Sequence, residues 1–142
     1  MNTNLIETYY TKENGYHPFF IREHWQVAQL NFMTRLSFIS IDRLDLHQHT
    51  DEIFVLTRGK AVLIAGFIGN NQVHFECVLM NPGVPYNIPV NTWHTIAMDE
   101  NAQVIITEKS NTHLGDCLYY NLTDTDRGRL KNKILQLVNQ SS

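Results

Sequence analysis

Two short stretches of the sequence combine histidines with acidic residues at spacings that suit a divalent metal ion. The first runs from Asp45 to Glu52 and contains His47 and His49; the second is a proline-containing turn that leads to His94. Side chains alternate along an extended strand, so Asp45, His47 and His49 would point to one side. Two imidazoles and one carboxylate with positions left open suit Fe(II), Mn, Ni or Zn and leave room for water or a substrate.

Short runs rich in Val, Ile, Leu and Phe must position these side chains. We expect about nine strands, with turn residues at 57–60, 69–71 and 99–102 closing three hairpins. The expected strands cover residues 27–32, 36–41, 44–49, 53–56, 61–68, 72–79, 93–98, 104–107 and 118–120. Regular short strands with almost no helix predict an all-β, antiparallel sandwich or barrel.

The two ends of the chain differ from this pattern. Residues 9–24 are aromatic and irregular, and we expect the N-terminal segment 1–24 to lie over a barrel formed by residues 25–120. Residues 121–142 predict a short C-terminal helix, with an N-cap in the segment from Thr123 to Asp126. An apolar face of this helix would pack on the barrel or at a dimer contact. The face consists of Leu130, Ile134, Leu137 and Val138.

Both histidine stretches resemble the motifs of one protein family. The segment from His47, with six residues between Glu52 and Gly59, resembles the first cupin motif. The second cupin motif is matched by the spacing of Gly83, Pro89, Asn91 and His94. The chain is therefore identified as similar to small, single-domain cupins of the RmlC-like superfamily. The resemblance implies a jelly-roll barrel, an antiparallel double-stranded β-helix, with a divalent metal ion inside it.

The resemblance can be aligned in two registers. In one, His47 and His49 are the paired histidines of the first motif, and a shortened turn leads to Glu52. In the other, Asp45 stands at the first-histidine position, His47 at the second, and His49 lies in the turn. Both registers keep His47, Glu52 and His94, so these three rank above His49 and Asp45 as metal ligands.

Two further positions depart from the second cupin motif. Asn91 replaces the usual glycine, which is a mild change because Asn also adopts left-handed backbone conformations. Met98 replaces the usual asparagine, so a hydrogen bond from that position to the site is not expected.

Strand alternation extends the site into a mostly apolar pocket. If Glu52 and His94 face inward, every second residue after each of them does so too. The expected pocket residues are Arg43, Phe54, Leu56, Tyr86, Ile96 and Met98. Such a pocket would bind a modest organic molecule that offers one or two oxygens to the metal. The remaining histidines, at 17, 24, 74 and 113, are interpreted as structural.

Three functions remain open at this point. The first is a metal-dependent enzyme acting on a small oxygenated molecule, such as a dioxygenase, isomerase or lyase, as the resemblance permits. The second is a non-catalytic cupin that binds or senses a small molecule. The third is a metal-free sugar-nucleotide isomerase or epimerase, which would need a basic cleft, whereas Lys and Arg total only 11 and four of them lie in the tail. No general base is evident outside the ligand set apart from Asp45.

Composition limits the binding partners and the cellular location that we expect for this protein. A length of 142 residues predicts one domain, and a net charge of −3 gives no reason to expect nucleic acid or a membrane as a partner. Cys77 and Cys117 are interpreted as buried, reduced thiols, and we expect a cytoplasmic protein without a signal peptide. Pairing of edge strands, with Trp25, Trp93 and the aromatic N-terminal segment supplying apolar contacts, predicts a homodimer.

Overall fold

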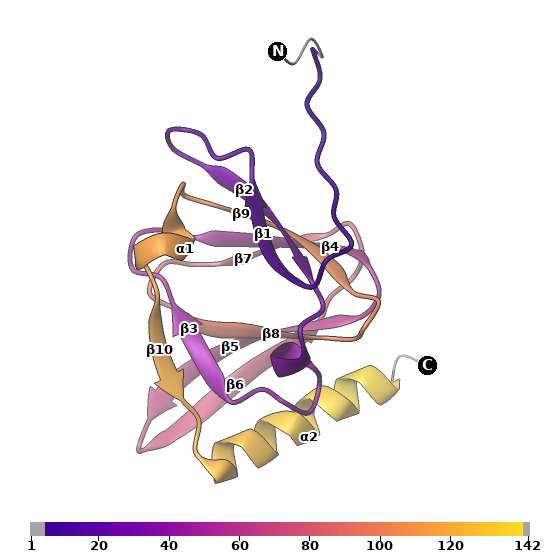
Figure 1. The fold of residues 1–142 in the computed structure, drawn as a ribbon. Helices are drawn as coiled ribbons and strands as arrows, with labels where there is room; N and C mark the ends of the chain where they lie inside the picture. The colour runs from indigo at the N-terminus through magenta and orange to yellow at the C-terminus, as the bar shows by residue number, and fades with distance from the viewer. Residues whose placement is uncertain (1–4, 141–142) are drawn as a thin grey trace.

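The computed structural model describes residues 5–140 and consists of two antiparallel sheets that face each other (Figure 1). The first sheet has the order β1 (Gly15–Phe19), β2 (Gln26–Asn31), β9 (Gln103–Glu108), β4 (Glu52–Arg58) and β7 (Pro85–Ile88). The second has the order β10 (Leu118–Asn121), β3 (Arg43–Leu46), β8 (Trp93–Met98), β5 (Ala61–Gly69) and β6 (Gln72–Leu79). The helices are the 3-10 turn η1 (Thr34–Leu36), the short α1 (Thr112–Gly115) and the C-terminal α2 (Asp124–Gln140).

From β3 onward the chain crosses repeatedly between the two sheets, and this corrects two of the three expected hairpins. Of these three pairs of strands, only β5 and β6 pair across their turn, at residues 69–71. Asn70 and Asn71 have φ angles of 54° and 59°, which is the left-handed conformation that a two-residue hairpin turn requires. The turns at 57–60 and 99–102 instead connect strands of different sheets, β4 to β5 and β8 to β9. This crossing pattern makes the fold a jelly roll.

The two crossing turns pack against each other. The Asp99 amide donates to the Lys60 carbonyl at 3.0 Å, and Arg58 Nε donates to the Asn101 carbonyl at 3.0 Å. Gly59 has a φ of +75°, and a Cβ atom placed there would lie 2.5 Å from the backbone of Ala102. A glycine is therefore required at position 59 by both its backbone conformation and the close approach of the second turn.

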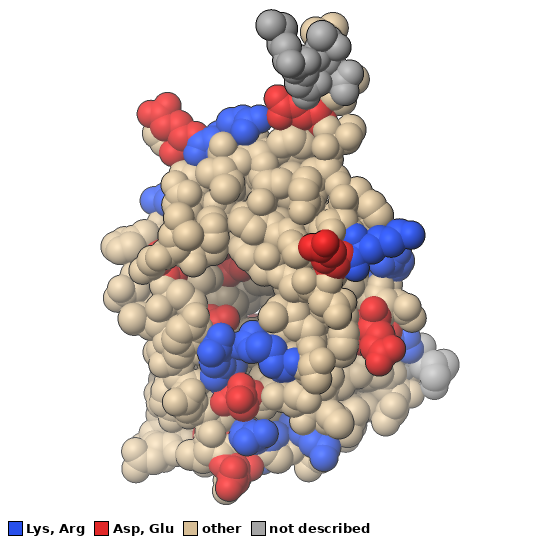
Figure 2. All heavy atoms as spheres, viewed as in Figure 1, with Lys and Arg blue, Asp and Glu red and all other residues tan. Residues whose placement is uncertain are grey.

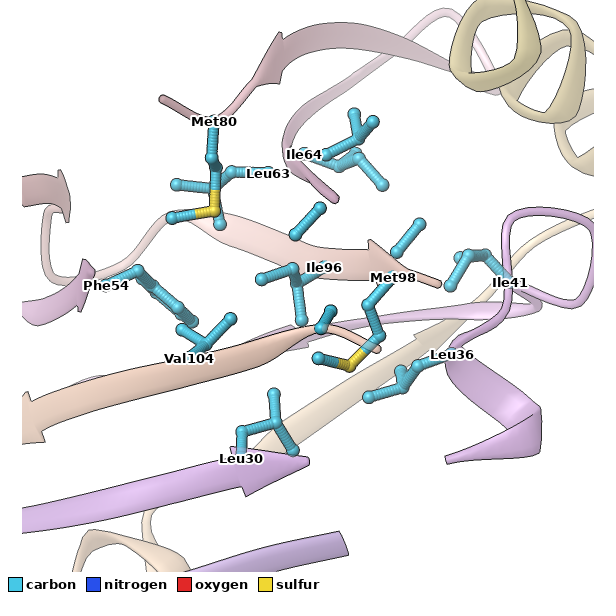
Figure 3. Packing of buried hydrophobic residues seen from close by; sticks show 14 of the residues in the cluster. Leu30, Leu36, Ile41, Phe54, Leu63, Ile64, Met80, Ile96, Met98 and Val104 are labelled. Carbon is cyan, nitrogen blue, oxygen red and sulfur yellow. The ribbon is translucent and has the colours of Figure 1, made fainter. Parts of the chain in front are cut away.

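The core lies between the sheets, where inward-facing side chains of both meet. Leu30, Phe54 and Val104 come from the first sheet, and Ile96 and Met98 from the second (Figure 3). The same alternation that buries Phe54 also turns Glu52 inward, since the burial of β4 repeats every second residue.

Helix α2 covers the outer face of the second sheet by packing on β5 and β6. β5 is therefore covered on both faces, by the core on one side and by α2 on the other. Its first residues are all buried, so the sequence there is a continuous apolar run instead of an alternating one. The helix begins as predicted, because the Thr123 hydroxyl accepts a hydrogen bond from the Asp126 amide at 3.1 Å. Leu130 and Ile134 are fully buried, which confirms the predicted apolar face.

The strand predicted over residues 36–41 is wrong. Residues 34–36 form η1, and a turn follows in which the Ser40 amide donates to the Ser37 carbonyl at 3.1 Å. Leu36 and Ile41 are buried individually as anchors on either side of this turn. Single buried apolar residues in a loop therefore gave this segment the same composition as a strand.

Two strands were not predicted, and both lie at the edges of the first sheet. β1 falls within the stretch 9–24 that was expected to be irregular, and it pairs with β2 from Gly15 to Phe19. Both edge strands contain a proline, Pro18 in β1 and Pro85 in β7. Proline lacks the amide that an interior strand needs on both sides, so it is tolerated at an edge but obscures the strand pattern.

Several expectations about the surface can be compared with the structure. Among the described residues, none of the helices has the length and apolar character needed to cross a membrane. Both cysteines are free thiols, and they are half-buried instead of buried. Trp25, which was expected to supply an apolar contact in a homodimer, is 47% exposed. The homodimer itself stays a prediction.

A pair of glycine substitutions tests the packing of the crossing turns. Gly59→Ala should lower the free energy of unfolding by about 2–4 kcal/mol, because it combines a left-handed backbone with a clash against Ala102. Gly83→Ala is the matched control, since Gly83 has a similar φ of +78° but open space around it. We expect it to cost about 1 kcal/mol. Urea unfolding measures both, and equal costs would contradict the packing of the two turns.

Candidate metal centre

Three side chains from three different strands converge at one point inside the barrel. His47 directly follows β3, Glu52 begins β4, and His94 is the second residue of β8. The Nε2 atoms of His47 and His94 lie 2.9 Å and 2.8 Å from the same Glu52 oxygen, Oε2. The side chains are 12%, 5% and 8% exposed for His47, His94 and Glu52. This group could hold a metal ion, because its ligand atoms all lie within 4.8 Å of one another.

Backbone contacts tie the two histidine stretches together. The Asn91 amide donates to the His47 carbonyl at 2.8 Å, and Asn91 has a φ of 62°. Asn therefore adopts the left-handed conformation that a glycine would supply at this position. Asp51, next to Glu52, accepts a hydrogen bond from the Val90 amide at 2.9 Å. The turn before β8 is thus held against the residues that carry both other members of the group.

The second ring nitrogen of each histidine contacts a backbone carbonyl. His47 Nδ1 contacts the Asp116 carbonyl, and His94 Nδ1 lies 2.9 Å from the Thr92 carbonyl. A carbonyl can only accept, so each Nδ1 carries the hydrogen and donates. This arrangement fixes the tautomer and the ring orientation and leaves each Nε2 directed at the centre, as for many metal-binding histidines.

The donor atoms lie slightly closer together than the ligands of a bound transition metal ion would. Two ligands bound at about 2.1 Å lie about 3.4 Å apart at a tetrahedral angle and about 3.0 Å apart at a right angle. The observed separations of 2.8 Å and 2.9 Å from Glu52 Oε2 are shorter than these values, so the side chains would move apart by about 0.1–0.6 Å to admit an ion. Two imidazoles and a carboxylate on one side of the ion suit Fe(II), Mn, Ni or Zn.

When no metal ion is bound, the Nε2 atoms of His47 and His94 carry hydrogens that point at Glu52. Burial opposes charge on Glu52, but hydrogen bonds from His47 and His94 outweigh it and lower the Glu52 pKa to about 2. Burial likewise opposes charge on His47, but the hydrogen bond and charge of Glu52 raise its pKa to about 9. The pKa of His94 is also raised by Glu52 against the effect of burial. A metal ion therefore competes with protons for both Nε2 atoms.

A cavity of about 240 Å³ opens beside this group. Figure 2 shows the surface hollowed on this side of the barrel, with acidic atoms inside the hollow and basic side chains along its lower rim. Apolar walls are formed by Leu30, Leu36, Phe54, Ile96 and Ile106. Polar side chains also line the cavity, namely Tyr16, Arg35, Asp45, Glu108 and His113.

The two alternative ligands lie apart from the group of three. Asp45 lines the cavity and lies opposite His94 in the pairing of β3 with β8. Burial raises the pKa of Asp45, and its Oδ1 has no hydrogen-bond partner among residues 5–140. His49 is exposed because β3 ends at Leu46, so the alternation expected along residues 44–49 stops before His47. Its amide donates to the Asp116 carboxylate at 2.9 Å.

The expected pocket residues divide into two groups. Phe54 and Ile96 line the cavity. Leu56 and Met98, one inward position further along their strands, are fully buried in the core below it. The other two lie elsewhere: the Tyr86 hydroxyl accepts a hydrogen bond from the Asn81 amide at 2.9 Å, and Arg43 lies over the Tyr119 ring at 4.1 Å.

Sequence reasoning missed four of the polar residues of the cavity wall, namely Tyr16, Arg35, Glu108 and His113, the last of which was interpreted as structural. Glu108 could have been found, because it continues the inward alternation of Val104 and Ile106 by one step at the end of β9. Tyr16 lies in β1, which gave no strand signal, and Arg35 lies in η1, which was taken for part of a strand.

The pKa shifts predict how the stability of the metal-free protein depends on pH. The raised pKa of His47 adds stability below about pH 6.5, which is lost as the pH rises through about 9. The lowered pKa of Glu52 adds stability above about pH 4.5, which is lost as the pH falls toward 2. We expect urea unfolding to show a decline on the order of 2–3 kcal/mol from pH 6 to 9. The exposed His74→Ala variant should keep this decline, whereas a flat profile would contradict the shared carboxylate.

Comparisons with known proteins show likeness at the level of the fold. No family model and no curated protein matches the sequence. The structure of BH2720 from Bacillus halodurans aligns with a TM-score of 0.53 and 16% identity, over 74% of this chain and 77% of that one. CapF, solved with the inhibitor 3-isopropenyl-tropolone, aligns with a TM-score of 0.51 and 17% identity, over 77% of this chain and 33% of that one.

An RmlC-like cupin protein from Desulfovibrio desulfuricans aligns with a TM-score of 0.45 and 12% identity, over 77% of this chain and 94% of that one. Identities this low bear on the fold alone. The two facing sheets, their strand order and the chain crossing between them show that this protein has the jelly-roll barrel of the cupin fold.

Proposed function

We propose that this protein binds a divalent metal ion through His47, Glu52 and His94 and acts on a small oxygenated organic molecule in the adjoining cavity. One observation carries the proposal. Two imidazoles with fixed tautomers direct their Nε2 atoms at one carboxylate oxygen, in a largely buried position that borders a cavity.

Three protein ligands are typical of a metal site that takes part in chemistry. Structural sites are usually closed by four protein ligands, whereas catalytic sites keep a position for water or substrate. When bound, the ion would supply Lewis-acid chemistry to an oxygen of the molecule in the cavity. The chain itself contributes the orientation of the ligands through the Asp116 and Thr92 carbonyls and excludes bulk water with the apolar walls.

The cavity favours a small molecule that carries oxygens. Its volume of about 240 Å³ lies below the range of about 300–1,000 Å³ that drug-sized ligands occupy. Arg35 lines it, and its guanidinium makes no hydrogen bond or ion pair within residues 5–140 and acts on Asp45 only through its charge, so it is available to an oxygen of the ligand. A sugar nucleotide is less well supported, because it would need a larger and more basic cleft.

Metal titration tests the proposed site directly. Protein stripped with a chelator should take up one equivalent of Zn(II), Ni(II), Mn(II) or Fe(II) per chain, measured by calorimetry and elemental analysis. His94→Ala should weaken binding by about 100-fold or more, because it removes one of three ligands. His74→Ala is the control, since His74 is exposed on β6. Equal affinities of the two variants, with both shown to be folded, would contradict the site.

Turnover separates an enzyme from a non-catalytic binding protein. Metal-loaded protein should consume or convert at least one member of a panel of diols, enols and 2-oxo acids, followed by oxygen uptake and product analysis. The His94→Ala variant should be inactive on the same compound. A binding protein would instead show a raised unfolding temperature with a ligand and no conversion, which would contradict the enzymatic part of the proposal.

A further inference from the structure

A second polar group faces the cavity from the strand next to Glu52. Glu108 ends β9, is 6% exposed and lines the cavity. In the pairing of β4 with β9, Ile53 lies opposite Thr107, so the next position of the same register places Glu108 opposite Glu52. Residues directly opposite in an antiparallel pair point to the same face. Both carboxyl groups therefore point into the barrel beside each other.

One oxygen of Glu108 is fixed by neighbouring side chains. Oε1 accepts hydrogen bonds from the Tyr16 hydroxyl and from Gln26 Nε2, the latter at 3.3 Å. Gln26 is fully buried and is itself held, because its Oε1 accepts from the Asn111 amide at 2.7 Å. His113 Nδ1 lies 3.1 Å from the same Gln26 nitrogen. The orientation of the Glu108 carboxyl is thus set by three elements, β1, β2 and the segment before α1.

The other oxygen, Oε2, is buried and has no hydrogen-bond partner in the described part of the chain. Buried polar atoms are nearly always paired, and leaving one unpaired opposes folding. A carboxyl that is held through one oxygen and unpaired at the other lacks a partner among the described residues. Glu108 lines the cavity wall, so a group in the cavity can supply this partner once the carboxyl turns enough to expose Oε2.

The hydrogen bonds of Glu108 narrow the chemistry of that group. Both neighbouring donors, the Tyr16 hydroxyl and Gln26 Nε2, donate to Oε1, so neither supplies a hydrogen to Oε2. A group that donates to Oε2 would complete the pairing of the carboxyl, and a group that can also accept would match it whether or not the carboxyl carries a proton. A hydroxyl group does both, whereas a carbonyl only accepts and an ammonium group only donates.

We propose that Glu108 binds a hydroxyl group of the molecule in the cavity, at a position separate from the oxygens that face His47, Glu52 and His94. The inference rests on the proposed function and specifies its ligand as a small hydroxylated compound. Tyr16 and Gln26 are positioning residues that hold the carboxyl toward the cavity.

Matched pairs of probes test this inference. Pyruvate and hydroxypyruvate share the same chelating oxygens, as do salicylate and 2,4-dihydroxybenzoate, but the second member of each pair has one more hydroxyl. Calorimetry on the full-length, Zn(II)-loaded protein should show that at least one hydroxylated probe binds about tenfold more tightly than its partner. In Glu108→Leu this gain should fall to about twofold or less. Glu76→Leu, on the exposed face of β6, should keep it.

A second variant covers the case in which Glu108→Leu does not fold. Tyr16→Phe leaves the carboxyl in place and removes one of its hydrogen bonds, so the gain should shrink without vanishing. A gain that survives unchanged in the folded variants overturns the inference, as does the lack of any gain in the wild type. Zinc stoichiometry is measured for each protein. Absent zinc would refute the proposed function, whereas bound zinc without a hydroxyl gain refutes only the role of Glu108.

Discussion

The structure depends most on one shared oxygen atom, Oε2 of Glu52, which meets the Nε2 atoms of His47 and His94. A buried carboxylate is costly unless it is paired, and here two imidazoles from different strands pair with it. That pairing requires β3, β4 and β8 to lie at fixed distances across the two sheets. The backbone bond from Asn91 to His47 and the tight crossing turns at Gly59 and Ala102 supply this rigidity.

Most strands could be predicted from the sequence, and the exceptions contain a proline. Short apolar runs indicated central strands such as β4, β8 and β9, and also β6 and β10, which form the edges of the second sheet. The edge strands of the first sheet, β1 and β7, contain a proline each and gave no signal. The sequence also does not distinguish a hairpin from a turn that changes sheets, because both use the same turn residues. Only the non-local contact of Gly59 with Ala102 shows the difference.

Site residues on or beside regular strands could be predicted, and those on irregular backbone could not. His47, Glu52 and His94 could be brought together from motif spacing, since each lies within or next to a central strand. The inward direction predicted for His49 did not hold, because β3 ends at Leu46. Glu108 was recoverable from the alternation of β9, whereas Tyr16 and Arg35 depend on an edge strand and a 3-10 turn that carry no comparable pattern.

Asp116 connects the centre to a part of the chain outside its three strands. Its carbonyl accepts from the His47 ring, while its carboxylate binds the amides of Gln48 and His49 at 2.8 Å and 2.9 Å. The neighbouring residues His113 and Cys117 line the cavity. The segment from 112 to 117 therefore forms a wall for the occupant and also sets the angle of an imidazole. An occupant that displaces this segment would change the orientation of the His47 ring, so the proposed binding of an ion and of a small molecule would be thermodynamically linked.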